Sequence, residues 1–214
     1  MKLSMMFGGE KYNFDSLKDV MAKANEEKSG DQLAGIAAES VQQRIAAKAV
    51  ISELLVKDIR ENPLIPPEND EVTRIIEQDV NEQIYGEIKN WSIEQLREYI
   101  LSNDTGDREL KRLSKGMNSE IIAAVTKLMS NLDLVHAANK VEILSTCNST
   151  IGQKGTLASR LQPNHPTDNI DGIIASLKEG LSYGIGDAVI GINPVDDSVE
   201  SVKKSFACHE RFHQ

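Results

Sequence analysis

The sequence predicts an α/β protein, with a helical region over residues 1–145 followed by strand–loop–helix units over residues 146–205. Three observations support this prediction. Apolar residues recur at helical spacing through the first two-thirds of the chain. Proline is absent between Pro67 and Pro163, as expected of a helical region. After residue 146, two short strand-like segments alternate with helix-like ones, which is typical of a parallel sheet or a barrel.

Capping residues and helix breakers divide the helical region. Asp15 or Ser16 caps a first predicted helix, which ends at the pair Ser29-Gly30. Apolar spacing then predicts one unbroken, alanine-rich helix from Asp31 to about Asp58. An extended connector follows, because proline removes a backbone donor and restricts the residue before it; its prolines are Pro63, Pro66 and Pro67.

Four more helices are predicted before residue 145. One has its apolar residues on a single face from Val72 to Ile84. The next begins at the capping box Ser92-Ile-Glu-Gln95, and residues 102–107 form a loop after it. The last two run from Asn118 or Ser119 to about Met129, and from Asp133 to about Val141.

Strands and helices are predicted to alternate in the last third of the chain. Residues 146–155 read as a loop, and residues 156–161 as a strand that ends before Pro163. A helix over 170–183 is broken by Gly184-Ile-Gly186, and a buried-type strand follows over 187–193. Asp196 or Asp197 caps the last predicted helix.

Composition excludes several classes of protein. The chain has 24 basic and 33 acidic side chains, a net charge of −9 and a pI near 5.0. Nonspecific nucleic-acid binding depends on Lys and Arg that neutralise phosphates, so we expect no nucleic-acid partner. No apolar run approaches the ~20 residues of a membrane span. Two cysteines cannot build a disulfide framework, and we expect a cytoplasmic protein with no membrane partner.

Arg160, Gln162, Asn193 and Pro194 are the candidate site residues. They lie where predicted strands end, and in a (β/α)8 barrel that edge carries the active site. Arg160 and Gln162 are two apart on an extended segment, so both side chains point to one face. With the Asn193 amide they would offer several donors and one or two acceptors to a small polar ligand. The alternative is an ion pair for Arg160 and turn formation at the two Asn/Pro sequences.

A zinc-binding pattern lies near the end of the chain. His209-Glu-Arg-Phe-His213 matches H-E-x-x-H, in which two His on one helix face bind zinc and the Glu acts as a base. That chemistry needs a third ligand, and only Gln214 follows the motif. His136 and His165 lie far upstream without ligand spacing. We expect a coincidental match and no metal site.

Four longer segments occur in a characteristic order: Ser29-Gly-Asp-Gln-Leu-Ala-Gly-Ile-Ala-Ala38, Lys89-Asn-Trp-Ser-Ile-Glu-Gln-Leu-Arg-Glu-Tyr99, Arg160-Leu-Gln-Pro-Asn164 and Gly180-Leu-Ser-Tyr-Gly-Ile-Gly-Asp-Ala-Val-Ile-Gly-Ile-Asn-Pro-Val195. Together they resemble the large (heavy) subunit of ethanolamine ammonia-lyase, from the N-terminus to about Lys204. The family is adenosylcobalamin-dependent and converts ethanolamine to acetaldehyde and ammonia by radical chemistry.

The resemblance implies a fold, partners and site roles. The helical region would precede a (β/α)8 (TIM) barrel, with cobalamin over its mouth and a small (light) subunit completing the site. Family large subunits form homo-oligomers, are cytoplasmic and often lie inside a bacterial microcompartment. Arg160, Gln162 and Asn193 match substrate contacts, and Pro194 matches a cobalamin contact. Family members keep the cofactor's own base on cobalt, so the absence of an Asp-x-His-x-x-Gly signature is no objection.

Two departures from the family are visible in the sequence. Family subunits are about twice this long, whereas residues 155–214 supply two βα units of a barrel that needs ~250 residues. Residues 206–214 lose the family pattern and read as an aberrant tail. The family's substrate carboxylates fall outside this sequence. We therefore expect an incomplete barrel and a truncated chain that is inactive alone. The alternatives are a non-catalytic helical assembly module over residues 1–145 and a zinc hydrolase.

Overall fold

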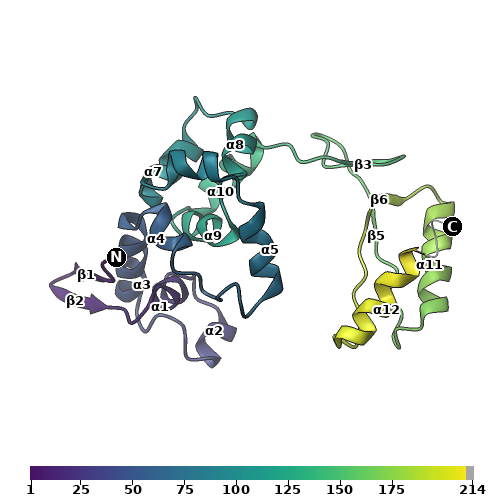
Figure 1. The fold of residues 1–214 in the computed structure, drawn as a ribbon, viewed down its shortest axis with the longest axis horizontal. Coiled ribbons are helices and arrows are strands. Elements are labelled where there is room, and N and C mark those ends of the chain that lie inside the picture. The colour runs from purple at the N-terminus through teal and green to yellow at the C-terminus, as the bar shows by residue number, and fades with distance from the viewer. Residues whose placement is uncertain (211–214) are drawn as a thin grey trace. The chain divides into compact units, whose positions relative to one another are not determined.

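The structure is a computed structural model that describes residues 1–210, with side chains described through residue 207. The chain divides into two compact units, Met1–Val141 and Glu142–Gln214 (Figure 1). The predicted boundary after residue 145 falls inside strand β3 of the second unit. Among the described helices, none combines the length and apolar character that a membrane crossing requires.

The first unit opens with a β-hairpin and continues as a series of short helices. The hairpin strands are β1 (Ser4–Phe7) and β2 (Glu10–Asn13). The helices are α1 (Leu17–Lys23), α2 (Ser29–Leu33), α3 (Val41–Glu53), α4 (Val56–Arg60), α5 (Glu71–Asp79), α6 (Glu82–Ile88), α7 (Ile93–Leu101), α8 (Asp107–Ser114), α9 (Ser119–Lys127) and α10 (Asn131–Lys140).

The N-terminal hairpin is an exception to the predicted helical region. β1 and β2 pair antiparallel, with Met5 opposite Tyr12, and both side chains pack against the core of the unit. The turn between them is Gly8-Gly9, with φ angles of 60° and 86°. A two-residue hairpin turn favours positive φ at both positions, which glycine adopts without a steric cost. The Gly-Gly pair was therefore the sequence signal for this hairpin.

The prediction of one unbroken helix from Asp31 to Asp58 is wrong, because the helix is interrupted twice and the range contains all of α3 and parts of α2 and α4. Ser29-Gly30, predicted to stop a helix, instead begins α2. Gly35 then takes a φ of 70°, and a new cap starts α3, where Ser40 Oγ accepts from Gln43 N at 3.1 Å. A Gly at positive φ just after the last turn is a common helix terminator.

The second break separates α3 from α4 and comes from pairing with a distant segment. Leu55 forms an antiparallel bridge with Ser92. Val56 N donates to the Trp91 carbonyl at 2.9 Å, and Ile93 N donates to the Leu54 carbonyl at 2.8 Å. Backbone groups that pair across the unit cannot also continue the helix ladder. Local apolar spacing carries no information about such a partner.

Two further differences concern the middle of the unit. The helix predicted over 72–84 is two helices, α5 and α6, because Asn81 starts a new one: its Oδ1 accepts from Ile84 N at 3.1 Å. Helix α8 is an additional helix, because the sequence predicts none over residues 107–114. The Ser92 capping box is confirmed, with Gln95 N donating to Ser92 Oγ at 3.0 Å and Ser92 N donating to Gln95 Oε1 at 2.8 Å.

The core of the first unit is aliphatic. Its largest fully buried side chains come from α1, α3, α4, α6, α7 and α9; they are Val20, Val50, Ile51, Val56, Ile59, Ile88, Ile93, Leu96, Ile121 and Val125. Ala46 and Ala47 of α3 are also completely buried, which lets neighbouring helices approach that helix closely. Burial of such side chains stabilises a domain by roughly 1.5–3 kcal/mol each relative to exposure.

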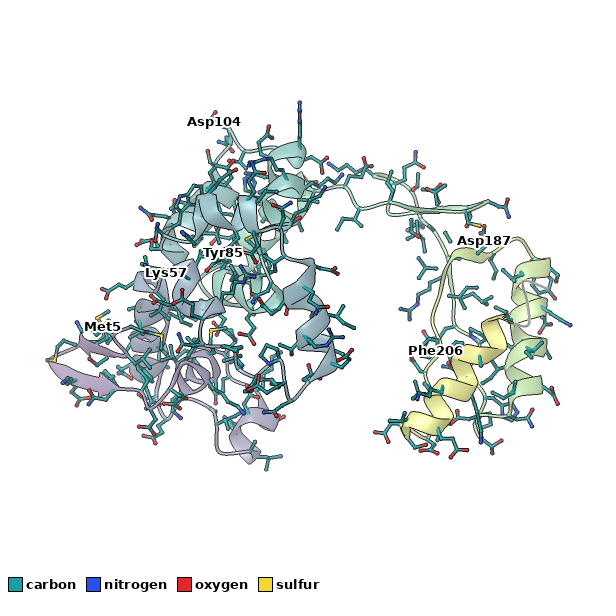
Figure 2. The ribbon with its side chains drawn as sticks, in the orientation of Figure 1. Met5, Lys57, Tyr85, Asp104, Asp187 and Phe206 are labelled. Atoms are coloured by element: carbon teal, nitrogen blue, oxygen red, sulfur yellow. The ribbon has the colours of Figure 1, made fainter. Side chains whose placement is uncertain are left out.

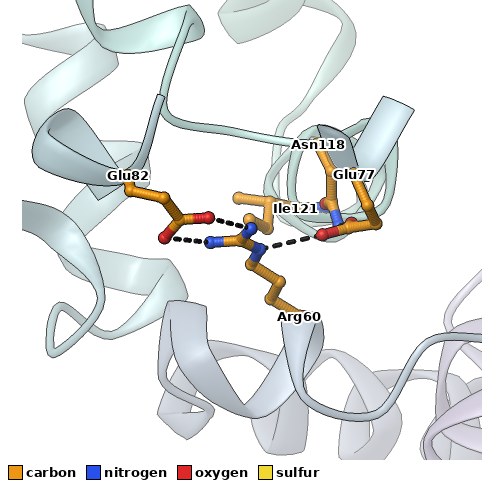
Figure 3. Close-up of polar contacts among 5 residues, drawn as sticks. All are labelled: Arg60, Glu77, Glu82, Asn118 and Ile121. Carbon is orange, nitrogen blue, oxygen red and sulfur yellow. Dashed lines mark hydrogen bonds and ion pairs between the residues drawn. The ribbon is translucent and has the colours of Figure 1, made fainter. Parts of the chain in front are cut away.

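A polar network joins four helices around Arg60, the last residue of α4. Its guanidinium donates to Glu77 of α5 at 2.9 Å and to both carboxylate oxygens of Glu82 of α6 (Figure 3). Its Cζ also lies 4.2 Å from the ring centroid of Tyr85. Glu77 in turn accepts from the buried amide of Asn118, whose Oδ1 caps α9 by accepting from Ile121 N at 2.9 Å. The network fixes α5 on the rest of the unit.

The second unit consists of short strands and two helices. Its elements are β3 (Ser145–Thr146), β4 (Thr150–Ile151), β5 (Arg160–Leu161), α11 (Ile170–Ser182), β6 (Gly186–Ile190) and α12 (Val199–Glu210). β5 and β6 pair in parallel and are connected by α11, which confirms the predicted α/β character and the strand–helix alternation.

Other predictions for this unit differ in detail from the structure. The strand predicted over 156–161 is only two residues long, and the loop predicted over 146–155 contains the antiparallel hairpin β3–β4. Of the tail predicted over 206–214, residues 206–210 continue α12 and residues 211–214 lie outside the described residues.

Close backbone approaches hold α11 and β6 against β5. Ile173 and Leu177 of α11 are buried, and a Cβ on Gly180 would lie only 2.4 Å from Leu161 Cδ1. Gly186 has a φ of 78°, and a Cβ there would lie 2.6 Å from the Leu161 backbone nitrogen. Both glycines therefore leave space that the strand β5 occupies.

Asp187 ties the β3–β4 hairpin to β6 (Figure 2). Its carboxylate accepts from Asn148 N at 2.5 Å, and from both the backbone N–H and the hydroxyl of Ser149. Ser145 Oγ adds a bond to the Ala188 carbonyl at 2.8 Å. The bonds from Ser149, above all, lower the pKa of Asp187 to about 2.

Candidate functional site

Arg160 and Gln162 lie together where β5 ends. The Arg160 guanidinium donates to Gln162 Oε1, as expected of side chains two apart on an extended segment. Arg160 is exposed and Gln162 is half-buried. A guanidinium has five N–H donors, so this bond leaves Arg160 able to donate to a ligand.

Arg160 also lies against the end of the neighbouring strand. Its Cζ and Nε would each be 3.6 Å from a Cβ placed on Gly191, just after β6. Gly191 N donates to the Leu161 carbonyl at 2.9 Å, which holds this point of β6 beside β5. Parallel strands end at the same edge of a sheet, so the loops after β5 and β6 are neighbours.

Asn193 is held in the loop after β6 through its backbone. Its N–H donates to Asn164 Oδ1 at 3.2 Å, and Asn164 belongs to the loop after β5. The Asn193 residue is exposed and the Pro194 residue is half-buried. Within the described part of the chain, no hydrogen bond joins the Asn193 side chain to Arg160, so a ligand would have to bridge them.

Asp168 is a second link between the two loops, and the sequence reasoning did not single it out. Its carboxylate accepts from Val195 N at 2.9 and 3.0 Å and from Asp196 N at 2.8 Å. These bonds, with the Asp196 N–H contributing most, lower the pKa of Asp168 below its ordinary value. Asn164 could have been found as the last residue of the segment Arg160-Leu-Gln-Pro-Asn164; the sequence around Asp168 carries no such signal.

The site has cationic and amide character, and the carboxylate of Asp168 in the loop after β5 is already engaged. The Asp168 carboxylate accepts hydrogen bonds from the backbone N–H groups of Val195 and Asp196. Arg160 can donate to an oxygen of a small ligand, while Asn193 can both donate and accept. An ammonium group would be repelled by Arg160 unless a further acceptor faced it.

No zinc site can be assigned. The side chain of His209 and all of His213 lie outside the described residues, so the expectation that the H-E-x-x-H match is coincidental stays a prediction. The part of the chain that is described holds no group of three or more His, Cys, Asp or Glu side chains suited to a metal ion. His165, the nearest histidine in sequence to Arg160, accepts at Nδ1 from Thr167 N at 3.3 Å.

The first unit contains a pocket that the sequence does not predict. A pocket of about 810 Å³ is lined by the end of α1, the start of α2, α3, the end of α9 and the start of α10. Three lysines line it, but Lys48 is paired with Glu26 at 2.5 Å and Lys127 donates to Asn25. Burial lowers the pKa of Lys127, although the charges around the pocket are of both signs.

Comparisons with known proteins point to one family. A family model described as the ethanolamine ammonia lyase large subunit (EutB) matches residues 12–214. The chain is 52% identical over 204 residues to proteins named ethanolamine ammonia-lyase large subunit from Escherichia coli K12, Escherichia coli O157:H7 and Salmonella typhimurium LT2. Each match covers 95% of this chain and 45% of the relative, so the chain spans just under half the length of these curated relatives.

Proposed function

The chain belongs to the ethanolamine ammonia-lyase large-subunit family, and on that premise we propose that its second unit supplies part of an ethanolamine and adenosylcobalamin site. The parallel pair β5–β6 would be the first two strands of a (β/α)8 barrel, whose active site lies at the carboxyl ends of the strands. Arg160, Gln162 and Asn193 would contact the substrate. Pro194 would contact the cofactor.

One observation supports this proposal most directly. The loops after β5 and β6 are joined by the bond from Asn193 N to Asn164 Oδ1, while Arg160 lies over Gly191 in the same region. The predicted substrate residues therefore come from two loops that are already in contact. A helical assembly module over residues 1–145 would need none of this, and the family match extends through both units.

Arg160 would bind and polarise the substrate oxygen. Preorganised donors aimed at developing charge are among the largest contributions to catalysis, and the Gln162 bond holds the guanidinium in place before the substrate arrives. The amide of Asn193 would donate to one substrate heteroatom and accept from another. Because Arg160 repels an ammonium group, the carboxylates that bind it would come from the part of the relatives that this chain does not match.

The residues near Pro194 fit an apolar cofactor surface. Val195 is 69% exposed beside the half-buried Pro194, so the loop presents apolar atoms to whatever lies over it. When bound, adenosylcobalamin supplies the carbon-centred radical that starts the family reaction. The role of the chain's own residues is to orient the substrate and to exclude water from it.

Membership of the family also indicates which partners the chain would have. The relatives are named large subunits, so we propose a small (light) subunit that completes the site, and a homo-oligomer of large subunits. By resemblance to the family we also propose a cytoplasmic location, within a bacterial microcompartment where the organism builds one.

A chimera tests the proposed site. The matching part of the Escherichia coli large subunit is replaced by this chain's matching residues, and activity is measured with the small subunit, adenosylcobalamin and ethanolamine. Removing one preorganised donor typically costs on the order of 3 kcal/mol, so Arg160→Ala should lower kcat at least ~100-fold. Asn193→Ala should raise the KM for ethanolamine as well as lower kcat.

Matched controls make the result specific. Arg108→Ala removes the same charge from the exposed start of α8 in the first unit and should leave kcat unchanged. Near-normal turnover in Arg160→Ala would refute the role of that residue. Loss of cobalamin affinity with unchanged ethanolamine binding in Asn193→Ala would assign Asn193 to the wrong ligand.

A further inference from the structure

In residues 193–196, which carry Asn193 and Pro194, each backbone N–H group donates to a side chain of the loop after β5. Pro194 has no N–H, so the donors of residues 193–196 belong to Asn193, Val195 and Asp196. Asn193 N donates to Asn164 Oδ1. Val195 N and Asp196 N donate to the carboxylate of Asp168. Two side chains of the neighbouring loop thus fix the path of this one.

The backbone of Asp168 is arranged for this contact. It has a φ of 50° and is the non-glycine residue with positive φ among those the structure describes. That conformation is unfavourable for residues with a Cβ, although Asp tolerates it better than most. Unfavourable backbone conformations persist where the surroundings over-determine them, and they cluster at functional sites. Here the conformation turns the carboxylate toward Val195 and Asp196.

The carboxylate also reaches the helix that follows the loop. Ser201 Oγ, in the first turns of α12, lies 3.4 Å from Asp168 Oδ2, in hydrogen-bonding geometry. Two oxygens without a competing donor can accept all of these bonds, whereas an amide would present an NH₂ group to one of the backbone N–H groups. A carboxylate is therefore better suited to this position than an amide of the same shape.

We propose that Asp168, assisted by Asn164, is a positioning residue that holds Asn193 and Pro194 in their binding arrangement. The proposal rests on the proposed function of those two residues. Asp168 touches neither substrate nor cofactor and acts through the loop that does. With the backbone of residues 193–196 fixed, the side chain of Asn193 and the ring of Pro194 stay available to ligands.

Two substitutions distinguish the contribution of the Asp168 carboxylate from that of its backbone conformation. Asp168→Gly removes the carboxylate and tolerates positive φ, while Asp168→Asn keeps the shape and loses the charge. Asp171→Asn is the matched control, because Asp171 lies in the first turn of α11 and, in the described chain, makes no hydrogen bond to residues 193–196. The first measurement is amide hydrogen exchange and ¹⁵N-edited NMR on the 214-residue chain.

Asp168→Gly should speed exchange at Val195 and Asp196 at least tenfold and shift the Asn193 side-chain NH₂ resonances. Asp168→Asn should give a smaller effect of the same kind, and Asp171→Asn none. Unchanged exchange in Asp168→Gly would refute the contact, and unmoved Asn193 resonances would refute the positioning role. If Asp168→Gly unfolds the second unit, Asn164→Ala decides instead: it should free the Asn193 amide and leave Val195 protected, and unchanged exchange at Asn193 would refute the proposal.

The second measurement uses the chimera described above. Asp168→Asn should lower kcat/KM for ethanolamine about tenfold, mainly through KM, because small misplacements of binding groups are costly. An unchanged kcat/KM, with exchange at Val195 altered, would refute the positioning role. Failure of the proposed function is distinguishable, since Arg160→Ala would then have no effect while the exchange result on Asp168 would stand.

Discussion

Different interactions stabilise the two units of this chain. The first, residues 1–141, surrounds an aliphatic core in which Val20, Ile51 and Ile121 are wholly buried. In the described part of the second, Ile173 and Leu177 are the apolar side chains that reach comparable burial, and loops are held by acceptors such as Asp168 and Asp187. The hydrophobic effect has no preferred direction, whereas a carboxylate bonded to particular N–H groups fixes particular residues in place. The second arrangement is better suited to holding a binding site.

The largest expected effect comes from removing core volume in the first unit. Ile121→Ala should lower the free energy of unfolding by about 2–5 kcal/mol, because the cavity adds to the lost transfer energy. The neighbouring Ile122 is 39% exposed, so Ile122→Ala should cost about 1 kcal/mol or less. Urea unfolding followed by fluorescence of Trp91, the single tryptophan, measures both. Equal losses would contradict a core that depends on burial.

The next largest effect distinguishes two glycines of the second unit. Gly184 and Gly186 both have positive φ, at 72° and 78°, but only Gly186 faces the backbone of Leu161. Gly184→Ala should cost about 1–2 kcal/mol for its φ alone. Gly186→Ala adds a steric clash and should cost about 3 kcal/mol or more, with loss of the β5–β6 pairing. Urea titration of the Val189 and Ile190 amide resonances measures the difference, and equal costs would show that the close approach does not matter.

A smaller effect is expected in the polar network of the first unit. Glu77 is 21% exposed and links Arg60 to the buried Asn118, whereas Glu82 is 71% exposed. Glu77→Gln should therefore cost about 1–3 kcal/mol, and Glu82→Gln about 0.5 kcal/mol. The same unfolding assay with Trp91 tests this. A larger cost for Glu82→Gln would mean that the network depends on charge rather than on burial.

The smallest expected effect is on the stability of the β3–β4 hairpin, which should change only in acid. The pKa of Asp187 is lowered from 3.8 to about 2, so its bonds to Asn148 and Ser149 stabilise the hairpin above pH 4. The unfolded chain binds the proton first as the pH falls, and the stabilisation is lost as the pH falls through about 2. Amide resonances of Asn148 and Ser149, followed from pH 6 to pH 2, report this change. Asp187→Asn should remove the pH dependence, and its persistence there would assign it to another group.

Sequence reasoning predicted what depends on local order and missed what depends on distant partners. The Ser92 capping box and the β5–α11–β6 alternation were both visible in the sequence and are confirmed. The break between α3 and α4 was not, since it follows from pairing between Leu55 and Ser92. The prediction of one helix over 72–84 is wrong because Asn81, a residue type common at N-caps, starts a new helix within that range.

The candidate site divides in the same way. Strand ends and family resemblance predict Arg160, Gln162, Asn193 and Pro194 as site residues. The bond between Arg160 and Gln162 agrees with their predicted common face. Neither signal predicts Asp168, because its contact with Val195 spans 27 positions of the sequence. A carboxylate that bonds to backbone N–H groups has no sequence pattern of its own.

The parallel pairing of β5 with β6 also sets the order in which the second unit can form. Arg160 meets Gly186 only after all of α11 has been placed between them, so the closure entropy of that loop is lost before any strand contact is gained. Non-local pairing of this kind slows folding compared with short-range helix contacts. On the ribosome the first unit emerges earlier and its helices can pack while β6 is still being synthesised. The residues of the candidate site are therefore brought together late in folding, after α11 has formed.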